Sequence, residues 1–116
     1  MAGALQAAIR RVVELVDKHG HGEPSYLNCA LSDGRNAVVS RFSNDPKDTP
    51  ESLYYYSGAI YPSLDGRVAR SVLVSSERLT ADEAWREIPP NHMVIVREGR
   101  DPELAAITIP TNAVDC

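Results

Sequence analysis

The sequence has little cysteine, no long apolar run and no cluster of basic residues. Its two cysteines, Cys29 and Cys116, are too few for a disulfide framework, so we expect reduced thiols and a cytoplasmic location. No apolar stretch has the length of a membrane span, and the N-terminus lacks the segment order of a signal peptide. The net charge of -4 gives no general attraction to nucleic acid or anionic membranes. The composition therefore predicts neither a nucleic-acid partner nor a membrane association.

Common catalytic and metal-binding patterns are also missing. The sequence has no Gly-rich phosphate loop, no Ser/His/Asp arrangement and no closely spaced set of carboxylates. His19 and His21, with Cys29 nearby, are poorly spaced for a metal, and a Gly-rich helix end explains them better. Cys29 is expected in mid-strand as a small core residue rather than a nucleophile, and nothing activates the terminal Cys116. The residues alone predict no metal, no cofactor and no complete catalytic set.

What the sequence does contain begins with an amphipathic helix over Ala4–Lys18. The helical spacing predicts one apolar stripe, widened by Ala8 and Val13, that is formed by Leu5, Ile9, Val12 and Val16. The glycines of the segment 19–22 are expected to end the helix with a left-handed cap. A β-hairpin is predicted next, over 26–32 and 36–42, because alternating residues flank an Asp33-Gly34 turn.

The remainder of the chain predicts short strands. After a polar loop over Ser43–Glu51, an aromatic strand over Ser52–Ser57 is expected to stop at Gly58, with irregular chain over 59–67. Further strands are predicted over 71–75, 93–97 and 104–109, and the chain end from Pro110 is expected to fray. Thr80 and Glu83 have the spacing of a capping box for a helical turn over Ala81–Trp85.

One helix followed by mostly antiparallel strands predicts an α+β fold. The length of 116 residues fits a single domain, 1–116. However, one amphipathic helix covers only part of a six-stranded sheet. We therefore expect the chain to be part of a larger layered domain.

Two places are candidates for a binding site. Tyr54, Tyr55 and Tyr56 alternate between the two faces of a strand, and Ser57 with Gly58 can bring the backbone close to a ligand; packing within the sheet is the alternative. Ser76 and Glu77 follow an apolar strand, and strand ends commonly carry sites. The alternative there is that Ser75 and Ser76 bond the backbone while Glu77 lies in water. The candidate substrate-binding residues are therefore Tyr54, Ser57, Ser76 and Glu77.

Three segments in order resemble a known family. They are Leu27-Asn-Cys-Ala-Leu-Ser-Asp-Gly34 leading to Val39-Ser-Arg-Phe42, then Pro50-Glu-Ser-Leu-Tyr-Tyr-Tyr-Ser57, and finally Val72-Leu-Val-Ser-Ser-Glu-Arg-Leu-Thr80 with Trp85-Arg-Glu-Ile-Pro-Pro-Asn91. Together they are similar to the C-terminal half of class II glutamine amidotransferase-like proteins. The nearest branch holds the fungal glutathione-degrading amidotransferase subunit and the ergothioneine-pathway γ-glutamyl hydrolase. Arg78 stands where that branch has Pro, and Ser75 where it has Ala.

The resemblance implies an N-terminal-nucleophile hydrolase fold, a four-layer αββα sandwich, that cleaves γ-glutamyl amide bonds through a thioester. The family's nucleophile is a cysteine after the initiator Met, and an Asn-Gly pair stabilises the oxyanion. This chain begins Met1-Ala2-Gly3 and contains no Asn-Gly pair. We therefore expect a C-terminal portion of such a domain, inactive alone, whose nucleophile comes from an N-terminal half or a partner chain. A non-catalytic binding or regulatory module is the alternative, and self-association into a homo-oligomer stays open.

Overall fold

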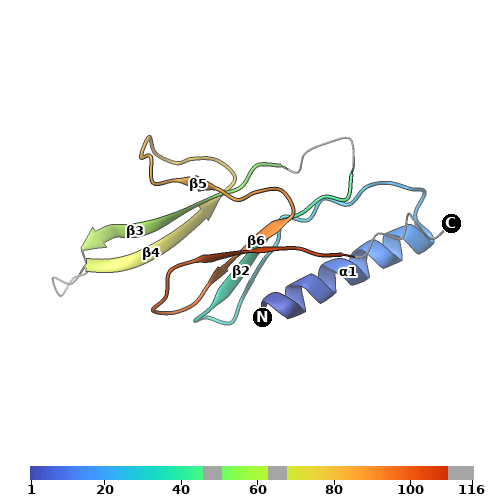
Figure 1. Cartoon of the computed structure of the whole chain (residues 1–116), viewed down its shortest axis with the longest axis horizontal. Coiled ribbons are helices and arrows are strands. Elements are labelled where there is room, and N and C mark those ends of the chain that lie inside the picture. The colour runs from blue at the N-terminus through green and yellow to red at the C-terminus, as the bar shows by residue number, and fades with distance from the viewer. Residues whose placement is uncertain (46–50, 63–67, 110–116) are drawn as a thin grey trace.

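The structure is a computed structural model that describes residues 1–45, 51–62 and 68–109, and only the backbone of residues 59–62 and 68–70. These ranges form an α+β structure, as predicted, with a helix followed by antiparallel strands (Figure 1). The elements are α1 (Ala2–His19), β1 (Ala30–Ser32), β2 (Ala37–Arg41), β3 (Tyr54–Pro62), β4 (Val68–Ser75), β5 (Arg86–Glu87), β6 (His92–Val96) and β7 (Glu103–Ala106). Residues 46–50 of the predicted loop, the segment 63–67 and the chain end from Pro110 lie outside the described residues.

The helix α1 buries a stripe that is narrower than predicted. Leu5, Ile9 and Val13 are buried and Val16 is half-buried, while Val12 is 38% exposed. The buried residues are four positions apart, so the face of α1 that contacts the sheet includes Val13 and leaves Val12 at its side. The stripe was therefore correct at Leu5, Ile9 and Val13 but wrong at Val12 and Ala8, which are exposed.

The end of α1 differs from the predicted left-handed cap. Gly20 is extended, with φ -90°, and its N–H donates to the Val16 carbonyl over 2.7 Å. The left-handed glycine is Gly22, with φ 87°. The chain thus satisfies a terminal helix carbonyl with an extended residue first, and turns only two residues later.

The first sheet has the strand order β1-β2-β6-β7, and all its pairs are antiparallel. The hairpin of β1 and β2 confirms the Asp33-Gly34 turn: Gly34 has φ 93°, and the Asp33 carboxylate accepts the N–H groups of Arg35 and Asn36. These two bonds lower the pKa of Asp33. One face of this sheet packs on α1, and the core between them contains Leu5, Ile9, Val13, Val38, Phe42, Met93 and Ile107.

The second sheet has the order β4-β3-β5 and corrects two predictions. Gly58 does not stop the aromatic strand, because β3 continues to Pro62 with a register shift between Ala59 and Tyr61. Residues 59–62, predicted to be irregular, are therefore strand, and β4 begins at Val68 rather than Ser71. A glycine weakens a strand, but the hydrogen bonds of the antiparallel pairing with β4 keep β3 extended through Gly58. The two-residue strand β5 has no counterpart among the predicted elements.

The strands form two sheets instead of the predicted single six-stranded sheet. Leu53, Tyr55 and Ile88 pack against Val94, on the face of the first sheet that points away from α1. Side chains on adjacent strand positions point to opposite faces, so β2 and β6 contribute to both cores. The result is a helix, a sheet and a second sheet that packs on the first through its β3–β5 end.

The segment between β4 and β5 does not form the predicted helical turn. Its residues 76–85 are bends and turns, in which the Asp82 carboxylate accepts the N–H of Ala84 over 2.9 Å. The Thr80 hydroxyl accepts hydrogen bonds from the Asp82 N–H over 3.3 Å and from the Trp85 ring Nε1 over 2.8 Å, so it stabilises a turn instead of capping a helix. The Trp85 ring is buried and lies 5.3 Å from Tyr56 between ring centroids. The buried Trp85 ring, and not a helical turn, thus fixes the position of this segment.

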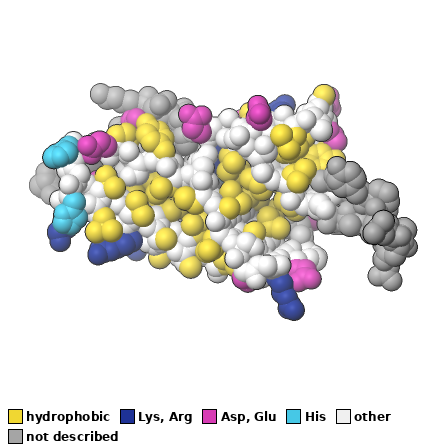
Figure 2. Space-filling view, turned by 180° about the vertical axis from the view of Figure 1, so that it is seen from behind, with side chains coloured by type: hydrophobic (Ala, Val, Ile, Leu, Met, Phe, Trp, Pro, Cys, Tyr) yellow, Lys and Arg dark blue, Asp and Glu magenta, His cyan; other side chains and the backbone are white. Residues whose placement is uncertain are grey.

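Large apolar side chains also remain exposed, and Figure 2 shows such side chains running across one face of the molecule. The exposed set comprises Met1, Val12, Leu15, Tyr26, Leu31, Leu73, Leu79 and Leu104. Leu31 and Leu104 lie on the outer strands of the first sheet. In the part of the chain that the structure describes, no helix is long and apolar enough to cross a membrane.

Candidate functional site

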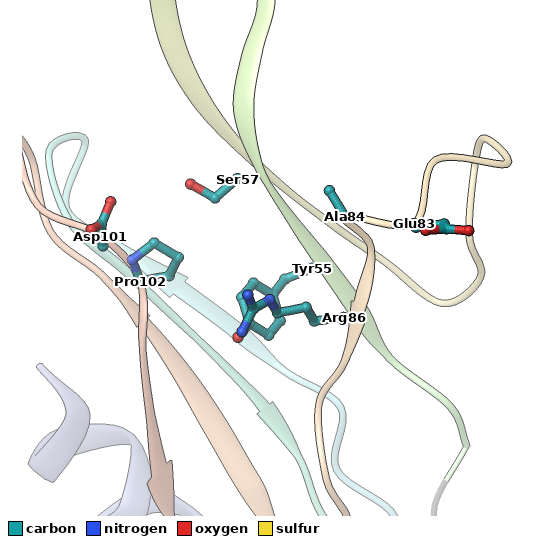
Figure 3. Close-up of a pocket in the computed structure, with 7 residues that line it drawn as sticks. All are labelled: Tyr55, Ser57, Glu83, Ala84, Arg86, Asp101 and Pro102. Carbon is teal, nitrogen blue, oxygen red and sulfur yellow. The ribbon is translucent and has the colours of Figure 1, made fainter.

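A hollow of about 390 Å³ opens between the second sheet and the turn that leads into β7 (Figure 3). Its described lining is made of Tyr55, Ser57, Glu83, Ala84, Arg86, Asp101 and Pro102. In Figure 3, Ser57 and Arg86 extend from the second sheet toward Asp101 and Pro102 on the opposite side. The hollow therefore joins segments that are far apart in the sequence.

Strand register explains why these side chains converge. Tyr55 and Ser57 are two positions apart on β3, so both point to the same face of the sheet. Arg86 is paired with Tyr55 across β3 and β5, which places it on that face as well. Tyr55 is buried and forms part of the contact between the two sheets. The side chains of the hollow thus come from β3 and β5 on one side and from the turn before β7 on the other.

The charged and polar groups of the hollow are largely available. In the described ranges, Arg86, Glu83 and Ser57 make no side-chain hydrogen bond or ion pair, whereas Asp101 has a partner. Arg86 therefore presents an uncompensated guanidinium, whose five N–H donors suit a carboxylate or a phosphate. Asp101 lies across the hollow and carries a negative charge (Figure 3). The lining can hold an anionic group and a cationic group at once.

Arg41 connects the two sheets behind this hollow. Its side chain is 3% exposed, donates from Nε to the Glu51 carbonyl over 3.0 Å, and donates from Nη1 to the Ile88 carbonyl. The same Nη1 lies 2.9 Å from the Glu87 carboxylate, which is 51% exposed. Glu87 and Arg86 are neighbours on β5, on opposite faces. Arg41 thus fixes the strand from which Arg86 projects.

The structure brings one of the four predicted site residues into the hollow. Ser57 lines it, whereas Tyr54 is on the opposite face of β3, where Arg78 lies 5.2 Å from its ring centroid. Ser76 is exposed and its carbonyl accepts a hydrogen bond from Ser52 over 3.1 Å. Glu77 is exposed and its N–H donates to the Ser75 hydroxyl over 3.4 Å. A substrate-binding role for these four residues stays a prediction.

Sequence reasoning missed Arg86 and Asp101. A signal for Arg86 existed in the segment from Trp85 to Asn91, where charged residues adjoin a buried tryptophan, but its strand is only two residues long. Asp101 precedes Pro102 in a turn, a pattern that sequence alone assigns to local structure. Only the packing of the two sheets places it across from Arg86.

The cysteine and histidine residues do not form a site in the described ranges. Cys29 is half-buried against the core under α1, and its N–H donates to the Ser40 hydroxyl over 3.1 Å. It precedes β1 rather than lying in mid-strand. No group of three or more His, Cys, Asp or Glu side chains in the described part of the chain is placed to hold a metal ion. Cys116 lies outside the described residues.

Tyr56 carries a perturbed phenol next to this region. Its hydroxyl donates to the Asp82 carboxylate over 3.0 Å. This hydrogen bond, together with the negative charge of Asp82, raises the pKa of Tyr56 above its ordinary value. The contact ties the segment between β4 and β5 to the outer face of β3.

Comparison with known proteins indicates a relationship to glutamine amidotransferases. No model of a known protein family matches the chain, and no solved structure matches it. The chain is 28% identical over 113 residues to a probable glutamine amidotransferase, DUG3, of Saccharomyces cerevisiae. The match covers 82% of this chain and 32% of the yeast protein, so the chain spans about a third of the length of this relative. This similarity supports a glutamine amidotransferase-like relationship for the chain.

Proposed function

We propose that this chain forms the C-terminal portion of a class II glutamine amidotransferase-like domain that cleaves γ-glutamyl amide bonds. The observation that carries the proposal is the similarity to a probable glutamine amidotransferase over most of this chain but a third of the relative. In this proposal the domain has the N-terminal-nucleophile hydrolase architecture. Residues 1–116 supply sheets, core and one wall of the site.

The layering supports this assignment. A four-layer αββα sandwich needs two packed sheets with helices outside them. The described residues provide a helix, a sheet and a second sheet that packs on the first. Exposed apolar residues on α1 and on both outer strands of the first sheet, among them Leu15, Leu31 and Leu104, are suited to contact further elements.

The proposed reaction has two halves. A cysteine thiolate attacks the γ-carbonyl carbon, its proton having passed to an α-amino group, and the amide nitrogen leaves with that proton while a γ-glutamyl thioester forms. Water then adds to the thioester, which releases glutamate and restores the thiol. We assign the nucleophile and the oxyanion donors to an N-terminal half or to a partner chain, because Cys29 packs in the core under α1.

The setting follows from the same proposal. The substrate is a small γ-glutamyl compound, and the reaction takes place in the cytoplasm without a metal or an organic cofactor. The overall negative charge supports a small-molecule substrate rather than nucleic acid or a membrane surface. Association with a second copy of the chain is compatible with the exposed apolar side chains.

A chimera tests the function directly. The segment of the yeast relative that matches this chain is replaced by residues 1–116, and the release of glutamate from a γ-glutamyl anilide is measured. We expect the chimera to hydrolyse the anilide and this chain alone to leave it intact. The matched control is the same chimera with the nucleophilic cysteine of the yeast part replaced by alanine.

Two outcomes decide the matter. A folded chimera without activity, beside an active yeast protein, contradicts the proposal. Hydrolysis by this chain alone, lost on Cys29→Ser, would show an independent enzyme instead. Sequencing the DNA upstream for an in-frame Met-Cys start and an Asn-Gly pair then separates an N-terminal half on the same chain from one on a separate chain.

A further inference from the structure

The hollow beside Arg86 has the features of a binding site for a small zwitterion. Its volume of about 390 Å³ is at the lower end of the range for ligand pockets, which suits a molecule of amino-acid or dipeptide size. Seven described residues of this chain line it. Binding of a ligand there is separate from the proposed reaction.

The positive end of the site is Arg86 together with Ser57. In the described ranges neither side chain has a hydrogen bond or an ion pair, although both extend into the same hollow (Figure 3). A guanidinium offers paired N–H donors in the geometry of a carboxylate, and a serine hydroxyl can add a third donor. Arg86 is held by its pairing with Tyr55, and Arg41 bonds the adjoining Glu87 and Ile88, so its strand is fixed before a ligand arrives.

The negative end is Asp101, across the hollow from Arg86. Its carboxylate already has a partner, but an ionised carboxylate has about four acceptor sites and can accept further donors. Glu83 also belongs to the lining, but its side chain extends away from Asp101 and Arg86 (Figure 3). A purely anionic ligand would meet the Asp101 carboxylate, whereas a ligand with an ammonium group would be attracted to it.

We propose that this hollow binds a small zwitterion, a free amino acid or a dipeptide, with its carboxylate on Arg86 and Ser57 and its ammonium group beside Asp101. Tyr55 and Pro102 form the apolar part of the lining between the two charged ends. The carboxylate supplies most of the affinity, since its bonds to Arg86 are charge-assisted. The ammonium contact supplies discrimination against simple anions.

The test uses the full chain labelled with ¹⁵N, and titrates it with alanylalanine while the backbone amide resonances are followed. We expect saturable shifts at Ser57, Arg86 and Asp101. Alanine, titrated in parallel, shows whether a free amino acid or a dipeptide fits better. Alanylalanine amide lacks the carboxylate and should bind at least about tenfold more weakly, and the N-acetyl dipeptide should also bind more weakly than the free dipeptide.

Two variants separate recognition from nonspecific effects of charge. Arg86→Gln should weaken dipeptide binding at least about tenfold. Arg35→Gln makes the same charge change on an exposed side chain of the β1–β2 turn and should leave binding unchanged. Both side chains lack partners in the described residues, so neither change should disturb the spectrum of the free protein. Absence of saturable shifts, equal binding of the blocked dipeptides, or unchanged binding by Arg86→Gln would overturn the proposal.

Discussion

Replacing Arg41 by methionine removes the side chain that connects the two sheets while keeping a flexible chain of similar length. The guanidinium is 3% exposed and bonds the carbonyl oxygens of Glu51 and Ile88 as well as the carboxylate of Glu87. After the change the buried Ile88 carbonyl loses its donor, whereas the Glu51 carbonyl keeps a second donor, Asn28 Nδ2, over 3.1 Å. The variant should therefore be less stable, and these three contacts, beside a further interaction of Arg41, give a lower estimate of the loss.

The Ile88 carbonyl dominates that estimate. Leaving the buried Ile88 acceptor without a donor costs about 1–3 kcal/mol, and losing one of two donors at the Glu51 carbonyl costs about 1 kcal/mol. The ion pair adds less than about 1 kcal/mol, because Glu87 is 51% exposed and can return to water. Removing the buried charge also recovers part of its desolvation penalty. We expect a net loss of about 2–3 kcal/mol in the free energy of unfolding.

Equilibrium unfolding in urea measures this loss, with the fluorescence of Trp85 as the probe. Trp85 is the sole tryptophan and its ring is 4% exposed, so unfolding should change its emission. Glu87→Gln is the matched control and should cost less than about 1 kcal/mol. A loss below about 0.5 kcal/mol for Arg41→Met would refute the reasoning. Equal losses in the two variants would show that the ion pair, not the carbonyl bonding, matters.

Two further predictions concern the helix and the perturbed tyrosine. Val13→Ala should lower the free energy of unfolding by about 2 kcal/mol, because the Val13 side chain is buried against the sheet. Val12→Ala should cost clearly less, because Val12 is 38% exposed. Equal urea midpoints for the two variants would contradict the orientation of the helix. Asp82→Asn should lower the pKa of Tyr56, followed by phenolate absorbance, because it removes the charge that favours the neutral phenol. The pKa of Tyr56 is higher in the folded state than in the unfolded state, where it is about 10. The hydrogen bond to Asp82 therefore stabilises the fold below about pH 10, and this contribution is lost as the pH rises through the folded-state pKa. An unchanged titration of Tyr56 in Asp82→Asn would exclude this cause.

Local patterns determined much of the secondary structure. The helical spacing of Leu5 and Ile9 predicts α1, and the Asp33-Gly34 turn predicts the hairpin of β1 and β2, because both signals act over a few residues. Where a local signal competed with a long-range pairing, the prediction was wrong. Gly58 has the features of a strand end, yet it pairs with Ser71 of β4, and β3 continues beyond it.

The candidate site shows the same division. The alternation of the tyrosines places Tyr55 and Ser57 on one face and Tyr54 on the other, and this follows from the two-residue period of a strand. The two-residue period does not determine which face of β3 packs against the first sheet. Leu53 and Ile88 decide it, since they bring the Tyr55 face against the first sheet and leave Tyr54 outside.

Sequence alone thus determined the α+β class, the elements with strong local signals and a family resemblance carried by three ordered segments. Only the tertiary structure decided that the strands divide into two sheets, that Arg41 is buried between them, and that Arg86 lies across a hollow from Asp101. The physical reason is that periodicity and turn chemistry act over a few residues. The burial of a charge and the meeting of β5 with the turn before β7 depend instead on how two sheets pack.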